Sequence, residues 1–216
     1  KVIEWTHVDD QLLAYGTLKN DLLFHKIPKE NYLYYINESL KLGKQKAKTY
    51  KYLSVEELCQ KNHIEISYNK QSGKFYGVQF RAQIELKKDY RKIILYTDSL
   101  CEMLEASQKY IDEQITFEDI VQIHLAHELF HFYEYIDQQP TNERLDRIVR
   151  FHLGPIKLHS TVMSSCEIAA HAFAKELLHL NDLPNVYDYI LLIHQKEMTI
   201  DGFQTLQEQW RREIGE

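Results

Sequence analysis

The chain has 216 residues, with 44% apolar residues, 7 glycines and 4 prolines. This composition is typical of a compact, helix-rich globular protein, and it excludes a disordered or collagen-like chain. The formal net charge of −6 offers no basic face of the kind that nucleic-acid-binding domains use, so we expect no direct contact with DNA or RNA.

The cysteines and the lengths of the apolar runs indicate in which cellular compartment the protein is expected. Cys59, Cys101 and Cys166 form no C-x-x-C pair, and their odd number favours reduced thiols over a secreted disulfide framework. No apolar run reaches the roughly 20 residues of a membrane span, and no signal-peptide pattern opens the chain. We therefore expect a cytoplasmic protein that does not contact membranes.

The first fifty residues are predicted to form an N-terminal helical extension, residues 1–50. A helix starts near Pro28, and an apolar stripe follows it at helical spacing. Ser54 has the features of an N-cap that opens the next helix. A second unit, residues 51–216, is expected to form the main domain, including the C-terminal helices.

Three alternating segments predict strands, at residues 64–68, 76–86 and 92–96, with a turn at Gln71-Ser72-Gly73. The helical pattern resumes afterwards. Helices are predicted at 100–111, 116–136, 142–151, 164–180, 186–196 and 203–214, with Gly154-Pro155 as a break. The expected fold class is α+β: a helix-rich domain with a small, mainly antiparallel three-stranded sheet packed on the helix at 116–136.

That helix carries the pentapeptide H-E-x-x-H, at residues His127, Glu128 and His131. Residues four apart on an α-helix lie about 6 Å apart along the axis and about 40° apart around it. Both imidazoles therefore reach one ion, and zinc accepts histidine nitrogen at roughly 2.0–2.1 Å. Glu128 is placed to take a proton from water at that ion. The alternative is an amphipathic helix whose histidines only form hydrogen bonds in the core, and a third ligand would decide between the two.

Several residues are candidates for the third ligand. Asp137 ends the longer pattern H-E-x-x-H-x-x-G-x-x-H/D, but Glu134 replaces the glycine that this pattern needs for its sharp turn. His152 and His159 flank the Gly154-Pro155 break, where histidines are more often solvated. Cys166 could bind zinc, although a small buried residue is the simpler interpretation.

Glu167 is the better candidate, 36 residues after His131. It opens a helix whose alanines at 169, 170, 172 and 174 permit close approach to a neighbouring helix, as a shared metal requires. The first turn of a helix also favours an acidic residue without any ligand, and the two interpretations are compatible.

With these residues the chain resembles the ImmA/IrrE-type metallopeptidases, whose pattern is H-E-x-x-H followed by E-x-x-A-x-x-F-A. The second part is matched by Glu167, Ala170, Phe173 and Ala174. The resemblance covers roughly residues 50 to 180, and it departs at Phe130, where the family often has glycine. No helix-turn-helix segment of the sort that some members carry is recognisable.

The resemblance implies a zincin-like domain in which His127, His131 and Glu167 bind Zn²⁺ and Glu128 is the general base. It implies hydrolysis of a peptide bond in a specific protein, often a DNA-binding repressor. The strand at 92–96 is the expected sheet edge for an extended substrate. The oxyanion donor is left open among His152, His159, His171 and the tyrosines.

Two other functions remain as alternatives. A zinc-containing regulatory module would bind a partner protein without cleaving it. A purely structural zinc site is a third possibility, but such sites normally have four protein ligands.

Overall fold

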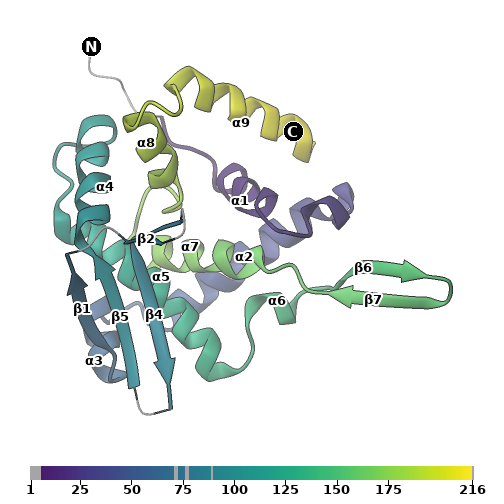
Figure 1. Cartoon of the computed structure of the whole chain (residues 1–216), viewed down its shortest axis with the longest axis horizontal. Coiled ribbons are helices and arrows are strands. Elements are labelled where there is room, and N and C mark those ends of the chain that lie inside the picture. Colours follow the sequence, from purple (N-terminus) through teal and green to yellow (C-terminus); the bar gives the residue numbers. More distant parts are fainter. Residues whose placement is uncertain (1–5, 71–72, 76–77, 89, 216) are drawn as a thin grey trace.

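The structure, a computed structural model, describes residues 6–70, 73–75, 78–88 and 90–215 (Figure 1). In chain order its elements are α1 (Asp10–Lys19), η1 (Phe24–Lys26), η2 (Lys29–Asn31), α2 (Tyr32–Lys48), α3 (Val55–Lys61), β1 (Glu65–Asn69), β2 (Gly73–Phe75), β3 (Val78–Phe80), β4 (Ala82–Lys87), β5 (Tyr90–Tyr96), α4 (Thr97–Tyr110), α5 (Phe117–Asp137), α6 (Thr141–Arg144), β6 (Ile148–Leu153), β7 (Ile156–Ser160), α7 (Ser164–Leu178), α8 (Val186–His194) and α9 (Ile200–Ile214).

The helix with the H-E-x-x-H motif, α5, forms where the sequence predicts it. It begins after Thr116, whose side chain accepts a hydrogen bond from the Asp119 amide while the Asp119 carboxylate accepts one from the Thr116 amide. This capping box satisfies amide groups that the first turn would otherwise leave without partners. The helix ends at Gln138, which adopts the left-handed conformation with φ of 52°. Ser54 likewise caps α3, in a capping box with Glu57.

The main sheet has the strand order β1-β5-β4, with β1 parallel and β4 antiparallel to β5. The predicted α+β class with a small three-stranded sheet is confirmed, and the sheet is mixed. β4 and β5 contact α5, and Ile93 and Leu95 of β5 are completely buried. The expectation that Lys92 to Tyr96 forms a substrate-binding edge is wrong, because β5 is hydrogen-bonded on both sides.

The segment predicted as one strand at 76–86 contains two strands, β3 and β4, separated at Arg81. β3 pairs with β2 in a separate two-stranded sheet. Tyr76 and Gly77 lie outside the described residues, as do Gln71 and Ser72 of the predicted turn.

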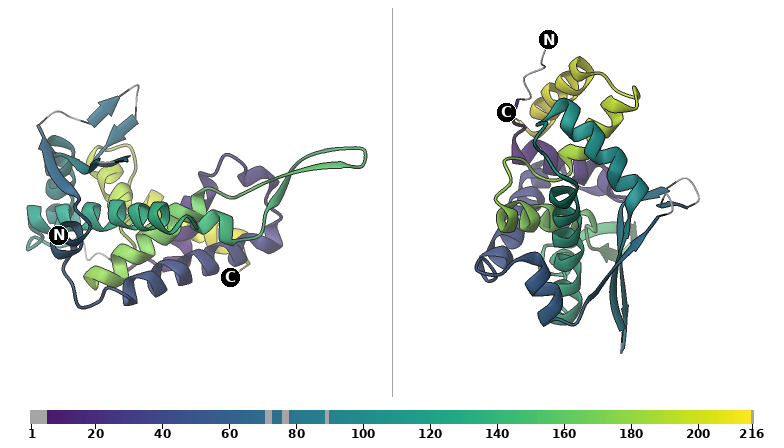
Figure 2. Two further views of the ribbon diagram at one scale, coloured as in Figure 1. Left: turned by 90° about the horizontal axis from the view of Figure 1, so that it is seen from below. Right: turned by 90° about the vertical axis from the view of Figure 1, so that its left-hand side faces the viewer.

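The predicted helix at 142–151 is wrong. Helix α6 stops at Arg144, and β6 and β7 then form an antiparallel hairpin that extends away from the rest of the chain (Figures 1 and 2). Consecutive β-branched residues, Ile148 and Val149, favour a strand here. Gly154, with φ of 57°, permits the reversal that was expected to be a simple helix break.

Helix α7 lies between α2 and α5 and contacts both of them. On the α2 side the contact is very close, since a Cβ atom built on Gly43 would lie 2.1 Å from the carbonyl oxygen of Ala169. On the other side, Ala170 and Ala174 belong to the same hydrophobic cluster as the buried face of α5. The small residues of α7 therefore fix its position from two directions.

The first fifty residues pack into the rest of the chain. One hydrophobic cluster joins Leu12 and Tyr15 of α1 to Phe203 and Trp210 of α9, and it includes Ile168 of α7. No helix in the described part of the chain is both long and apolar enough to cross a membrane.

Replacing Gly43 by alanine is expected to destabilise the protein by about 1–3 kcal/mol, because the added methyl group would overlap the backbone of α7. At an exposed helical position the same change would stabilise by roughly 0.5–1 kcal/mol, so the sign of the effect tests the contact. Chemical denaturation measures the difference, with Gln45→Ala on the exposed face of α2 as the control. A Gly43→Ala protein as stable as the wild type would contradict this packing.

Candidate metal centre

Two imidazoles of α5 point toward one location. The Nε2 atoms of His127 and His131 lie 3.2 Å apart, and their ring planes are inclined by 70°. One helical turn separates the two residues, so the helix itself sets this spacing. Both side chains are partly buried, with exposures of 17% and 23%, so the nitrogens are only partly hydrated.

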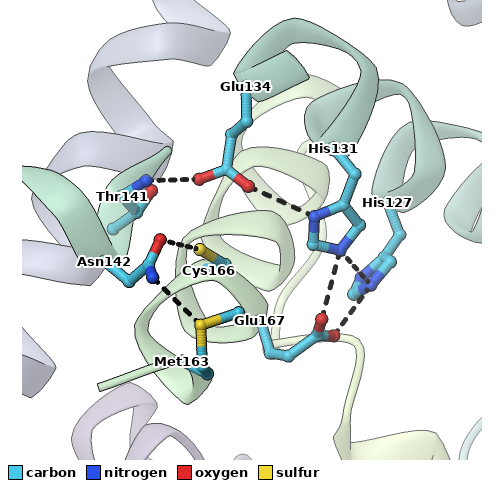
Figure 3. Close-up of polar contacts among 8 residues, drawn as sticks. All are labelled: His127, His131, Glu134, Thr141, Asn142, Met163, Cys166 and Glu167. Atoms are coloured by element: carbon cyan, nitrogen blue, oxygen red, sulfur yellow. Dashed lines mark hydrogen bonds and ion pairs between the residues drawn. The ribbon is translucent and has the colours of Figure 1, made fainter. Parts of the chain in front are cut away.

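The carboxylate of Glu167 completes a triangle of donor atoms (Figure 3). Its Oε2 lies 3.2 Å from Nε2 of His127, and its Oε1 lies 3.3 Å from Nε2 of His131. Ligands held tetrahedrally at the bond lengths of zinc are separated by about 3.3 Å. The two nitrogens and the carboxylate therefore match the spacing that a zinc ion requires, and these three residues fit zinc.

The charges at the centre favour a cation. Burial opposes ionisation of Glu167, but hydrogen bonds with His127 and His131 outweigh it and hold the pKa of this carboxyl well below its usual range. Burial likewise lowers the pKa of His131, and hydrogen bonds with Glu134 and Glu167 raise it to about 10. The carboxylates of Glu134 and Glu167 both contact the imidazole of His131, and together they stabilise positive charge at this ring.

Glu134 is a candidate functional residue that the sequence patterns did not predict. In the sequence this residue was noted only because it replaces the glycine of the longer H-E-x-x-H-x-x-G-x-x-H/D pattern. In the structure its Oε2 lies 3.3 Å from Nδ1 of His131 (Figure 3). Its Oε1 accepts a hydrogen bond of 2.6 Å from the amide of Thr141. When a metal replaces the proton on Nε2 of His131, the Glu134 carboxylate would hold the remaining hydrogen on Nδ1, the tautomer in which Nε2 binds the metal. An acidic residue three positions after the second histidine is the signal that could have revealed it.

Replacing Glu134 by alanine is expected to weaken zinc binding by about 10–100-fold, as the loss of a carboxylate partner of a zinc-bound histidine typically does. Competition with a zinc-binding dye measures the affinity without any substrate. Glu143→Ala is the control, because Glu143 is an exposed acidic residue that pairs with Arg147 away from the histidines. Equal affinities of the Glu134 variant and the wild type would exclude the orienting role.

His171 offers a second way to complete the donor set. One donor atom from each of His127, Glu167 and His171 falls within 4.8 Å of the other two. The ring of His171 lies 4.8 Å from that of His127, and its buried Nδ1 has no hydrogen-bond partner among the described residues. Burial lowers the pKa of His171 well below its usual value and keeps the ring neutral. The set with His131 is the tighter of the two, so we assign the third position to His131.

The other candidates from the sequence interact elsewhere. Asp137 forms an ion pair of 2.5 Å with Lys46. His152 and His159 lie on the exposed β6–β7 hairpin. The thiol of Cys166 donates a hydrogen bond to the side-chain oxygen of Asn142, and burial raises the pKa of this thiol to about 12.

Glu128, the predicted general base, follows His127 in the sequence and is half-buried, and its negative charge contributes to the raised pKa of His131.

A groove of about 1660 Å³ runs along this centre, and His131, Glu167 and His171 lie in its wall. Its other walls come from α1 and the segment after it, α6, the base of the β6–β7 hairpin, α8 and α9. Pockets for small molecules typically enclose about 300–1,000 Å³. The larger volume suits a length of polypeptide.

No model of a protein family, no curated protein and no solved structure matches this chain. The assignment of the centre therefore depends on its residues and their geometry.

Proposed function

We propose that the protein is a zinc-dependent endopeptidase of narrow specificity. The observation that carries the proposal is the convergence of His127, His131 and Glu167 at zinc-like spacing, with His131 and Glu167 in the wall of a groove. With zinc held by these three side chains, a fourth coordination position would stay open, as in catalytic rather than structural zinc sites.

A zinc ion held by His127, His131 and Glu167 would supply a Lewis acid that makes water a stronger nucleophile at neutral pH. Glu128 accepts a proton from water that attacks the peptide carbonyl, and it returns that proton to the leaving amine. Glu128 follows His127 in the sequence and is half-buried, and its negative charge acts on His131, which supports this role. His171 is the nearest candidate for stabilising the oxyanion, since it is neutral and lines the groove.

The substrate that best suits the groove is an extended protein segment. The resemblance to ImmA/IrrE-type peptidases favours a regulatory protein, such as a DNA-binding repressor. Because β5 is paired on both sides, it cannot pair with a substrate. β4 lies at an edge of the main sheet and contacts α5, so we infer that a substrate pairs with β4 instead.

The test combines metal analysis with cleavage. The purified protein should contain about one zinc per chain. The zinc-loaded protein should generate new amino termini in its candidate substrate, a DNA-binding repressor encoded by a neighbouring gene, the class of substrate that the resemblance implies. A Glu128→Gln variant, incubated in parallel, controls for contaminating proteases. A stable complex with that repressor and no cleavage would replace this proposal with the regulatory module. Absence of zinc would exclude both.

A further inference from the structure

The β6–β7 hairpin, here called the arm, has one apolar face. Residues opposite one another in an antiparallel pair point to the same face, and the faces alternate along each strand. Phe151 pairs with Leu158, and Leu153 pairs with Ile156. These four apolar side chains therefore lie on the same face of the arm.

The opposite face of the arm is basic. His152 pairs with Lys157, and His159 follows two residues later on that same face. The register shifts at Arg150, between Val149 and Phe151, which places Val149 opposite His159. The arm is consequently amphipathic: the four apolar residues share one face, and His152, Lys157 and His159 share the other with Val149 near the base.

The apolar face of the arm is not packed against the other residues that the structure describes. Its four side chains are between 51% and 65% exposed, although the residues around the base, Ile148 and Val162, are buried. A two-stranded hairpin is at best marginally stable in water without a covered apolar face. Exposed apolar surface of this kind marks an interaction site.

The charge of the arm differs in sign from that of the chain. No aspartate or glutamate occurs between residues 147 and 166, whereas the whole chain has 32 acidic and 26 basic residues. Neither Arg150 nor Lys157 forms a salt bridge with any residue that the structure describes. Both cations are thus available to an acidic partner.

The arm begins at the mouth of the groove. Arg150 and Ser160 at its base line the groove together with His131 and Glu167 of the metal centre. Two exposed apolar residues, Met163 at 62% and Leu22 at 91%, also line this groove. A chain that lies against the arm can therefore extend into the groove.

We propose that the arm binds the protein substrate, by holding an extended segment in which acidic residues flank apolar ones. This inference builds on the proposed peptidase function, since it calls the bound chain a substrate. An anionic lipid surface is disfavoured because the arm has only Arg150 and Lys157, whereas lipid-binding segments typically cluster about four to eight Lys or Arg residues. A second copy is disfavoured because four half-exposed side chains offer a few hundred Å², below the roughly 800 Å² per partner of a standard interface.

The test selects peptides from a random 12-residue display library that bind to the zinc-loaded protein. The protein carries Glu128→Gln, because this substitution removes the general base and so prevents cleavage of bound peptides. Three proteins are compared. One has the unaltered arm, the second carries Leu153→Ser with Ile156→Ser, and the third carries Arg150→Glu with Lys157→Glu. Tyr52→Ser with Tyr68→Ser is the matched control, because these aromatic residues are also exposed but lie outside the arm. Zinc content and thermal stability verify that each variant is folded.

We expect the unaltered arm and the control to enrich peptides with acidic residues beside apolar ones. Binding of the enriched peptides should fall at least about 10-fold for the serine variant, and the charge-reversed variant should enrich basic peptides instead. No enrichment, equal enrichment by all proteins, or enrichment of basic peptides by the unaltered arm would overturn the proposal. So would arm-dependent sedimentation with phosphatidylserine vesicles, or arm-dependent dimerisation, without peptide enrichment.

Cleavage is measured separately, with the same variants in a background that retains Glu128. If the intact protein hydrolyses the repressor and the serine variant enriches the same peptides as the unaltered arm, the arm proposal is wrong and the peptidase proposal stands. Arm-dependent enrichment without any hydrolysis would sink the peptidase proposal and leave a binding surface.

Discussion

Replacing Glu128 by glutamine is expected to lower the rate of peptide-bond hydrolysis by about 10²–10⁴-fold, the usual contribution of a general base. Glutamine has nearly the same shape but cannot accept the proton from water at neutral pH. The metal ligands His127, His131 and Glu167 are untouched, so zinc content should stay at the wild-type level. Single-turnover cleavage of the repressor, with the protein in excess, measures the rate independently of product release.

The control for this substitution is Glu118→Gln, in the first turn of the same helix. Glu118 accepts a hydrogen bond from Gln122 and lies more than two turns from the histidines, so cleavage should be unchanged. If Glu128→Gln cleaved the repressor as fast as the wild type, the mechanism would be wrong whatever the zinc content.

Replacing Glu167 by alanine is expected to weaken zinc binding by more than about 100-fold, beyond the effect of losing an outer partner of a ligand. Two imidazoles alone would remain, and the carboxylate charge that stabilises the cation would be lost. Chelator competition followed by metal analysis measures this affinity. Alanine is a strong helix former, so α7 should persist, as circular dichroism can verify.

Glu176→Ala is the matched control, since Glu176 lies on the same helix nine residues later. Parallel measurements on His131→Ala and His171→Ala distinguish the two possible donor sets. A large loss for His131 and a small one for His171 supports the assignment made from distances. Full zinc occupancy in Glu167→Ala would show that the third ligand is another residue.

The local patterns of the sequence predicted the helices that carry the centre. H-E-x-x-H fixes two side chains by helical spacing alone, and the Thr116 capping box marks the start of α5. Glu167 could be singled out because its helix is rich in alanine, and the structure brings it to both histidines. Contacts within one helix depend on short-range periodicity, which a single sequence displays.

Features that depend on pairing between distant segments were predicted less well. The position of β5 between β1 and β4 follows from which strands meet in space, which alternation within each strand does not encode. The first part of β6, residues 148–151, was mistaken for a helix because Arg150 interrupts the alternation at the register shift, which weakens the strand signal. The orienting role of Glu134 depends on Thr141, beyond the end of α5.

The contact of Gly43 with Ala169 also limits which sequences can preserve this centre. Any side chain at position 43 would push α7 away from α2, and Glu167 lies on α7 only two residues before Ala169. Distant relatives are therefore expected to keep glycine 84 positions before the first histidine of the motif, along with the acidic residue at position 134. Such a spaced signature, glycine then H-E-x-x-H-x-x-E then E-x-A, offers a way to find homologues that whole-chain similarity does not detect.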